Sequence, residues 1–510
     1  MSAIAEAGAR PAVNKWAATM TVMIGMMATV MTSTMINVAI PHIMGAFGVG
    51  QDRAHWLSTG FLAAMTVAML LNAWFVRNLG PRNTYVLANL VFVGASVMGN
   101  LSPTFGGVIA ARVVQGACAG LIQPLGLGVI FTAFPPAERG KAMGFFGMGV
   151  VVGPALGPLV GGAIVDAIDW RFVFLGALPL NIIAAALGAH FIPGRDGTRG
   201  RLNWTSFALI VVAVASFLNG ISSGQRDGWE APSVLGLLTL AALATLVFIE
   251  LESRTENPLL NVRLFTDRGF AMASLVGCMF GAGMFGTIYL VPIFVQQVQG
   301  FTASKAGLLL MIAGLFPVAM YPLAGWLAQR FHTGYTIAAG LALFGVSSLG
   351  LAGADADTGF WTLVGFVATG DIGLAFVFPP LMATALRGLA PALVAHGSGT
   401  LNFIRMIGGA VGVNTAAIVL ERRVAFHADA LAATQTGDGG LTRGVLDMIG
   451  ALAGAGGVAV PDRLPLALDY LGEVVAGRAA VLAFQDCFLL LAVGFAVATV
   501  ATLVLVPRRA

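Results

Sequence analysis

The 510-residue sequence has little charge: only 10% of its residues are Asp, Glu, Lys or Arg, whereas 58% are apolar. Soluble domains carry roughly 25% charged residues, so this chain has too little polar surface to cover a water-soluble particle. Cysteine is also scarce. Cys118, Cys278 and Cys487 lie far apart in apolar blocks, a spacing that fits neither a disulfide framework nor a metal site.

Several functional signatures are missing as well. The sequence contains no phosphate-binding Gly-Lys-Ser/Thr loop, no nucleophile elbow and no metal-spaced set of His, Cys or Asp. We therefore expect no enzyme activity, no ATP coupling, no cofactor and no metal. The net charge is 27 − 23 = +4, but the basic residues are scattered between apolar blocks, which argues against a nucleic-acid partner.

Long apolar runs are what the sequence does contain. Runs of roughly 17–25 residues can cross a bilayer as helices, and the absence of period-2 alternation excludes barrel strands. The first run, which begins near Lys15, has no small-residue cleavage site and is interpreted as a span rather than a signal peptide. The sequence predicts an all-α integral membrane protein with 14 transmembrane helices at 16–38, 54–76, 83–101, 106–132, 140–165, 171–192, 204–222, 232–250, 270–294, 305–328, 334–353, 358–385, 398–420 and 480–507.

The distribution of Lys and Arg predicts the orientation. An even number of spans puts both termini on one side, and sixteen Lys and Arg residues fall on that side against nine on the other. Five of those nine belong to the long segment 421–479, whose charges count less toward topology. We expect both termini in the cytoplasm and the chain in the inner (plasma) membrane.

A duplicated architecture is indicated by two similar span ends. Ala73-Trp74-Phe75-Val76-Arg77 and Gly325-Trp326-Leu327-Ala328-Gln329-Arg330 both place a Trp after a small residue and before a basic turn. Repeated halves in a membrane protein favour alternating access around a central site. The predicted units are an N-terminal six-helix bundle (1–192), linkers with two extra helices (193–269), and a C-terminal six-helix bundle (270–510). Segment 421–479 is expected as an external loop with some helix of its own, around 441–452 and 464–475.

The fifth predicted span carries the strongest local pattern. Glycines at four-residue intervals give one helix face a smooth stripe that a neighbouring backbone can approach closely, and prolines remove backbone donors and permit bending. Two Gly-Pro pairs in register favour a hinge or seal in a transporter over generic packing. The residues are Gly149, Gly153, Pro154, Gly157, Pro158, Gly161 and Gly162.

Two charged residues within spans are candidates for energy coupling. Arg112 lies inside 106–132, where a buried charge is costly and must face protein or a water-filled cavity. Asp371 lies about 20 Å from one end of span 358–385, near mid-depth. A proton carrier needs a titratable group at that depth, so we expect Asp371 to serve, the alternative being a structural partner of an internal Arg or amide.

Several motifs together resemble one family. They are Arg112-Val113-Val114-Gln115-Gly116, the span-five glycines, Trp170-Arg171-Phe172-Val173-Phe174, Asn257-Pro258-Leu259-Leu260 and Arg405-Met406-Ile407-Gly408-Gly409-Ala410-Val411-Gly412. The chain resembles the fourteen-span drug:proton antiporters of the major facilitator superfamily, and most of all their EmrB-like branch. The resemblance implies export of hydrophobic compounds driven by proton entry, with Arg112 in the proton-linked motif and the span-five glycines in the antiporter motif. It also implies a periplasmic adaptor and an outer-membrane duct as partners.

The chain departs from that family at two places. Many members have an Asp in the first span where this sequence has Thr32, and the usual Asp after the second span is Arg77 here, with Arg82 following. We expect Asp371 to replace the missing first-helix acid, and Arg77, Arg82 and Arg405 to act in gating. Candidates that could line the substrate cavity, or could instead hydrogen-bond between helices, are Asn37, Gln115, Gln123, Asn181, Asn402 and Asn414.

The sequence therefore predicts a proton-coupled secondary exporter of hydrophobic or amphipathic compounds. Anionic amphiphiles such as fatty or aromatic acids are as plausible as cationic drugs, because a cation site would require more buried carboxylate than the chain offers. A uniporter or importer of small organic anions with the same fold is the alternative that remains open.

Overall fold

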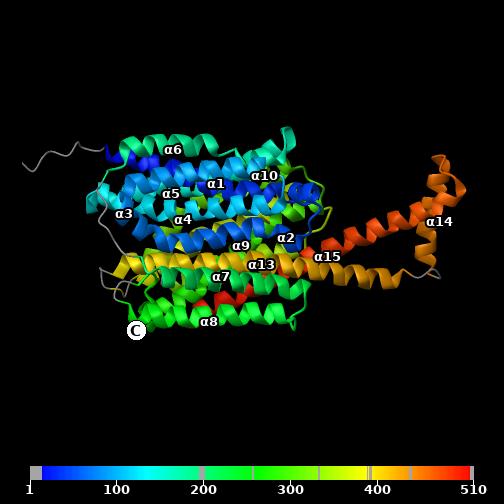
Figure 1. The fold of residues 1–510 in the computed structure, drawn as a ribbon. Coiled ribbons are helices and arrows are strands. Elements are labelled where there is room, and N and C mark those ends of the chain that lie inside the picture. The colour runs from blue at the N-terminus through cyan, green and yellow to red at the C-terminus, as the bar shows by residue number, and fades with distance from the viewer. Residues whose placement is uncertain are drawn as a thin grey trace, which may run out of the picture.

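The structure, a computed structural model, describes residues 14–194, 202–255, 258–330, 333–386, 389, 393–435 and 439–505. Across these residues the chain is helical and contains no strand, as the apolar runs predict (Figure 1). The elements are α1 Lys15–Phe47, α2 Gln51–Ala54, α3 Trp56–Leu101, α4 Phe105–Ala133, α5 Pro136–Ala167, η1 Trp170–Phe174, α6 Leu178–Phe191, α7 Trp204–Arg226, α8 Pro232–Arg254, η2 Val262–Thr266, α9 Arg268–Gln297, α10 Ala303–Arg330, α11 Thr333–Ala352, α12 Phe360–Leu386, α13 Val394–Thr434, α14 Gly440–Ala455 and α15 Val460–Leu505.

Helix α3 contains two of the predicted spans. It breaks at Gly80, whose φ of 79° and ψ of 160° are non-helical and unfavourable for a residue with a side chain. Pro81 follows, where its missing N–H is tolerated at the start of the second helical stretch. One glycine therefore provides the connection between runs 54–76 and 83–101.

Eleven helices in the described ranges are long and apolar enough to cross a membrane. One of these candidates, Gln51–Leu101, covers two predicted runs, while α5 and α10 enter only as the shorter apolar stretches Val152–Ala167 and Ala303–Pro317. The chain is thus a helical, multi-pass membrane protein. The count of 14 spans stays a prediction.

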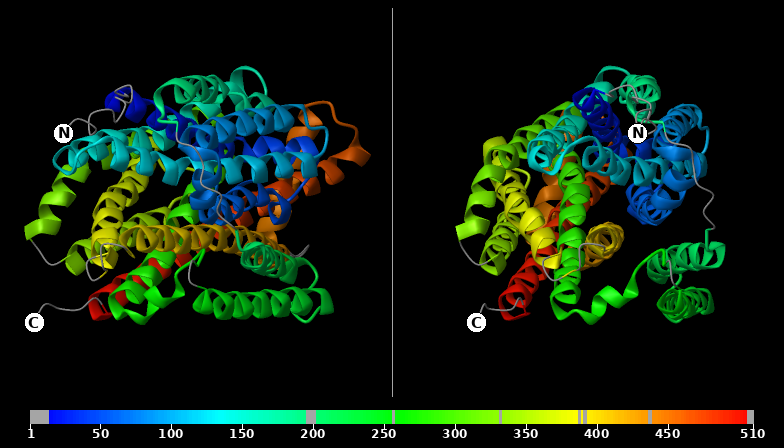
Figure 2. Two further views of the ribbon diagram at one scale, coloured as in Figure 1. Left: turned by 60° about the vertical axis from the view of Figure 1, so that its left-hand side comes forward. Right: turned by 90° about the vertical axis from the view of Figure 1, so that its left-hand side faces the viewer.

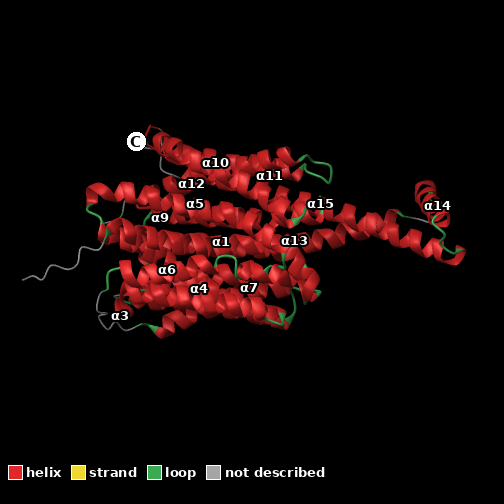
Figure 3. Cartoon of the chain, turned by 90° about the horizontal axis from the view of Figure 1, so that it is seen from above, coloured by secondary structure: helices red, strands yellow, loops and turns green. Residues whose placement is uncertain are grey.

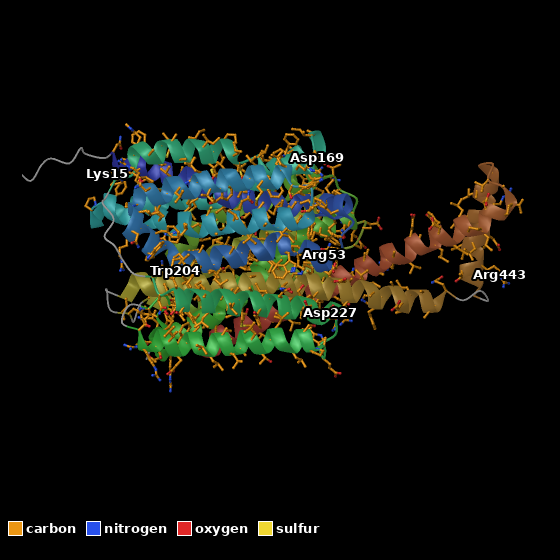
Figure 4. The ribbon with its side chains drawn as sticks, viewed as in Figure 1. Lys15, Arg53, Asp169, Trp204, Asp227 and Arg443 are labelled. Atoms are coloured by element: carbon orange, nitrogen blue, oxygen red, sulfur yellow. The ribbon has the colours of Figure 1, made fainter. Side chains whose placement is uncertain are left out.

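The bundle has two distinct ends. Lys15 and Trp204 lie at one end, and Arg53, Asp169 and Asp227 lie at the other (Figure 4). We call the first the terminal end, because α1 begins there and α15 finishes there (Figure 1). The second is the hairpin end, because helices project from it.

The projecting hairpin differs from the expected loop. Within 421–479, α13 continues to Thr434, α14 spans Gly440–Ala455 and α15 already begins at Val460. The three helices extend well beyond the rest of the bundle (Figure 3). At the base of this hairpin, Asp486 accepts a 2.7 Å hydrogen bond from His427 Nε2 and lies 3.4 Å from Arg423 Nε. The segment is mostly helical because α13 and α15 do not stop at the predicted span ends.

The inserted pair α7 and α8 lies along one side of the bundle (Figure 2). Helix α7 is joined to the start of α3 through His55, the residue just before that helix, whose Nε2 lies 3.1 Å from the Ser222 hydroxyl. It is joined to α13 by Asn414 Nδ2, which donates a 3.0 Å hydrogen bond to the Leu218 carbonyl. Since α3 and α13 belong to different predicted halves, α7 bridges the two.

Candidate functional site

Arg112 is the centre of a buried polar network in the predicted N-terminal half. Its side chain is 1% exposed. Nε donates to the Leu57 carbonyl at 3.0 Å, and Nη1 donates to Gln115 Oε1 at 3.0 Å. Gln115 Nε2 in turn donates to the Ser96 hydroxyl at 2.9 Å. The network ties α4 to both stretches of α3, which explains why an Arg and a Gln three residues apart occur inside an apolar helix.

The guanidinium is not neutralised by a carboxylate. Its central carbon lies 4.3 Å from the centre of the Phe61 ring, an arrangement that gives a cation–π attraction. Nη2 is buried with no hydrogen-bond partner among the described residues. A buried donor without a partner is costly, so this atom is available to an acceptor that enters the bundle. Leu57 and Arg112 both lie within about two turns of a helix start at the hairpin end.

Asp371 occupies the middle of α12, eleven residues after Phe360. It is partly buried and forms no hydrogen bond or ion pair with another described residue, Arg112 included. Helical spacing places it on the same face as Val367 and Ala368, which belong to the apolar cluster shared by both halves. Asp371 and Arg112 are therefore not paired with each other, and each belongs to a different half.

Another buried charge is explained by local structure. Glu252, at the terminal end of α8, is 1% exposed, and its Oε2 accepts a 2.9 Å hydrogen bond from the Leu260 backbone N–H. This bond fixes the linker that leads into η2 and α9. Glu252 is thus occupied in holding backbone. Asp371 is left as the mid-helix carboxylate without such a role.

The span-five glycines lie at two helix crossings. A side chain at Gly153, Gly157 or Gly161 would collide with α1, and one at Gly162 would collide with the Ala303 carbonyl of α10. A side chain at Gly307 of α10 would meet the Pro158 carbonyl in the same way. Pro154 lies inside the same helix, and the surroundings of Gly149 lie outside the described residues. The stripe therefore allows α5 to approach both α1 and the opposite half.

Of the predicted cavity residues, Asn37, Gln115 and Asn414 join helices in this structure, whereas Asn181 and Asn402 bond within their own helices. Asn37 Oδ1 accepts a 2.7 Å hydrogen bond from Ser58, and Asn181 donates to the Ala177 carbonyl of its own turn. Asn402 Oδ1 accepts from Arg405, and Asn414 binds the inserted helix α7. Gln123 is partly buried and forms no hydrogen bond with a described residue. A substrate contact for any of these residues remains a prediction.

The expected gating residues lie toward the terminal end. Arg77 is exposed near the Gly80 break, and Arg82 Nε donates a 2.8 Å hydrogen bond to the Ile192 carbonyl. Arg405 lies 4.9 Å from the centre of the Phe378 ring on α12, two turns beyond Asp371. At the first-helix position where many family members have an Asp, the Thr32 hydroxyl is buried and donates to the Ala28 carbonyl at 2.9 Å. Thr32 therefore supplies no titratable group.

Sequence reasoning missed the polar contacts that join the halves near the hairpin end. Gln296 Nε2 donates to the Val38 carbonyl at 3.0 Å, and the Tyr289 hydroxyl donates to Gln51 Oε1 at 2.6 Å. Asp166 of α5 accepts hydrogen bonds from the first backbone N–H groups of α10. No short-range pattern links such partners. An Asp directly after the Gly-Pro stripe was the one available signal.

These features define a polytopic helical membrane protein with charged side chains buried inside its bundle. The sequence model of the Major Facilitator Superfamily matches residues 22–413. The chain therefore belongs to this superfamily. Its members and this chain's relatives are transporters, so the protein is a membrane transporter and not an enzyme.

Drug exporters are among the similar proteins. The chain is 30% identical to the methylenomycin A resistance protein of Streptomyces coelicolor, over 78% of this chain and 84% of that protein. It is 28% identical to the multidrug export protein EmrB of Escherichia coli, over 78% of both. The crystal structure of a bacterial homologue of the human lysosomal transporter Spinster, inward-facing and unoccupied, matches with a TM-score of 0.62 at 15% identity, over 98% of each chain. This likeness supports the fold.

The Arg112 network can be tested through stability. Replacing Gln115 by Met should lower the free energy of unfolding by about 2 kcal/mol, because Arg112 Nη1 loses its acceptor inside the bundle. The measurement is unfolding by SDS in mixed micelles. Gln123→Met on the same helix is the matched control and should change stability much less. Equal losses in the two variants would contradict the structural role given to Gln115.

Proposed function

We propose that this transporter is a proton-coupled exporter of hydrophobic or amphipathic compounds, of the multidrug-efflux type, which works by alternating access. The observation that carries the proposal is Asp371, a partly buried mid-helix carboxylate with no partner in the described structure. A charge in that position is costly in a membrane protein and marks a functional group. The names of the relatives, which include a multidrug export protein and a resistance protein, support export of hydrophobic compounds.

Proton coupling follows from the cost of moving charge through the bundle. Ionised, Asp371 would be stable only while the cavity around it is hydrated, whereas a protonated carboxyl can be enclosed by apolar helices. Protonation from one side and release to the other would therefore accompany the switch between the two accessible states. In this scheme Asp371 carries the proton in place of the first-helix acid that Thr32 replaces.

Arg112 gives a specific reason to test anionic substrates. Its Nη2 is a buried, unpartnered donor, and guanidinium groups bind carboxylates in a geometrically defined way. If this donor reaches the substrate, the exporter is specialised for fatty or aromatic acids. We therefore keep anionic amphiphiles as a second substrate class beside cationic drugs, with a uniporter or importer of small organic anions as the competing function.

The hairpin is where we propose contact with a periplasmic adaptor that leads to an outer-membrane duct. Its helices leave large apolar side chains exposed, including Met448, Leu452, Leu464 and Leu468. Exposed apolar patches mark interaction surfaces. This proposal assumes the predicted orientation, in which both termini are cytoplasmic and the hairpin is external.

The coupling proposal predicts the behaviour of Asp371→Asn. In proteoliposomes with an imposed pH gradient, export of a hydrophobic cation or anion should fall at least tenfold, because the amide cannot exchange a proton. Asp371→Glu should retain a measurable part of the activity. Asp469→Asn, an exposed carboxylate of the hairpin, is the control and should transport like the parent protein.

Two results would contradict this account. Undiminished gradient-driven export by Asp371→Asn would remove Asp371 from coupling. Equal transport by the parent protein with and without the pH gradient would instead favour the uniporter.

The adaptor proposal makes a separate prediction. Leu452→Asp combined with Leu464→Asp should leave transport in proteoliposomes unchanged, since no partner is present there, but should reduce drug resistance of cells severalfold. The measurement compares two assays of the same variant: drug resistance of cells and transport in proteoliposomes. Full resistance in cells would show that this surface needs no partner.

A further inference from the structure

A carboxylate of one half holds the helix start of the other half near the hairpin end. Asp166, the next-to-last residue of α5, accepts hydrogen bonds from two backbone N–H groups of α10. Its Oδ1 lies 3.2 Å from Ala303 N, and its Oδ2 lies 2.7 Å from Ser304 N. These residues are 137 and 138 positions apart in the chain.

The start of α10 is therefore capped twice. The hydroxyl of Thr302 accepts from Lys305 N at 3.2 Å, which is an ordinary cap from the preceding residue. The N–H groups of Ala303 and Ser304 have no partner inside the helix, and Asp166 supplies both. A carboxylate there also interacts favourably with the positive end of the helix dipole. Part of this cap is thus contributed by the other predicted bundle.

Helices α5 and α10 are in direct backbone contact next to this cap. Gly162 of α5 lies directly against the Ala303 carbonyl, and Gly307 of α10 lies against the Pro158 carbonyl. The two backbones are in contact one turn away from the Asp166 cap. If α5 and α10 separate, the carboxylate cannot follow, and both hydrogen bonds break together.

We propose that Asp166 is a latch that holds the two halves together at the hairpin end and must release α10 in each transport cycle. The inference rests on the alternating-access part of the proposed function. It adds a positioning residue that never needs to touch substrate. Its role is to set the balance between the state closed at the hairpin end and the state open there.

The latch is distinct from the proton carrier. Partial burial works to raise the pKa of Asp166, but hydrogen bonds from Ser304, Thr302 and Ala303 together outweigh it and hold the pKa below its ordinary value. The closed state thus favours the ionised form. Its advantage is fully present above the ordinary carboxyl pKa and is lost as the pH falls from there through the lowered pKa of the closed state. Between pH 8 and 5, Asp166 stays ionised, so the latch should be insensitive to pH over that range.

Neighbouring charges do not alter this conclusion. The elements that pack against α5 carry these charged or titratable groups toward the hairpin end: His42 on α1, Lys305 on α10, Asp169 and Arg171 at η1, and Arg112 on α4. Lys305 Nζ lies 3.7 Å from the centre of the Phe301 ring, and Arg171 lies 3.7 Å from Asp169. Within the described chain, no ion pair joins any of these groups to Asp166.

The test measures opening directly. Spin labels at Leu101→Cys and Trp361→Cys, two exposed residues from different halves, report the separation at the hairpin end after Cys118, Cys278 and Cys487 are replaced by Ala. Asp166→Ala should raise the ratio of open to closed protein roughly fivefold, as expected for loss of a helix cap. Asp166→Asn retains one acceptor oxygen without charge, so its ratio of open to closed protein should lie between those of the parent protein and Asp166→Ala.

Asp169→Asn is the matched control, because among the described residues the Asp169 side chain contacts its own turn, at the backbone N–H and the side chain of Arg171. It should give the parent distance distribution. As the pH falls below about 4 the parent protein should move toward Asp166→Ala, since the carboxyl of the open state is protonated there and the advantage of the closed state shrinks. Unchanged distances in Asp166→Ala, with thermal unfolding like that of the parent, would overturn the latch.

Failure of the latch and failure of the proposed function give different results. The distance measurement needs neither substrate nor a pH gradient. Opening in Asp166→Ala without any gradient-driven export by the parent protein would leave the latch standing and remove proton coupling. Gradient-driven export by the parent protein, together with unchanged distances in Asp166→Ala, would support proton coupling and remove the latch.

Discussion

The crossing of α5 and α10 is the close backbone contact on which our account of the two predicted halves depends. Lipid offers helices no hydrophobic reason to associate, so close packing and interhelical hydrogen bonds must hold them together. Glycine supplies the close packing at Gly162 and Gly307, and Asp166 supplies the hydrogen bonds. A transporter that alternates needs a junction strong enough to seal and weak enough to part. A small backbone contact with one carboxylate has that balance.

Two charged residues within the bundle, Arg112 and Asp371, do not form an ion pair that would resist such a separation. Arg112 is satisfied by the Leu57 carbonyl and Gln115, apart from one nitrogen, and the mid-helix Asp371 belongs to the other half. An ion pair between them would have tied the halves together permanently, since breaking a buried pair is costly. Keeping the two charges separate leaves the halves free to move. In the proposed function it also leaves Asp371 available to protons and Arg112 available to substrate.

The hydrophobic runs predicted the helices well, because length and apolarity decide what can lie in a bilayer. The family was also predictable, since its motifs are local. The helical hairpin was only partly foreseen, because nothing in the span pattern shows that α13 and α15 continue past the membrane boundary. The partners of Asn414 and Asp166 could not be predicted: Leu218 and the start of α10 are more than 130 positions away, and only the tertiary structure brings them together.

The central proposal is that Asp371 carries the proton and releases it when the transported compound binds. The most direct measurement is proton release from the purified protein in weakly buffered detergent solution when a hydrophobic cation or anion is added. The account predicts release by the parent protein and none by Asp371→Asn, while both still bind the compound. Release of the same size from Asp371→Asn would contradict it.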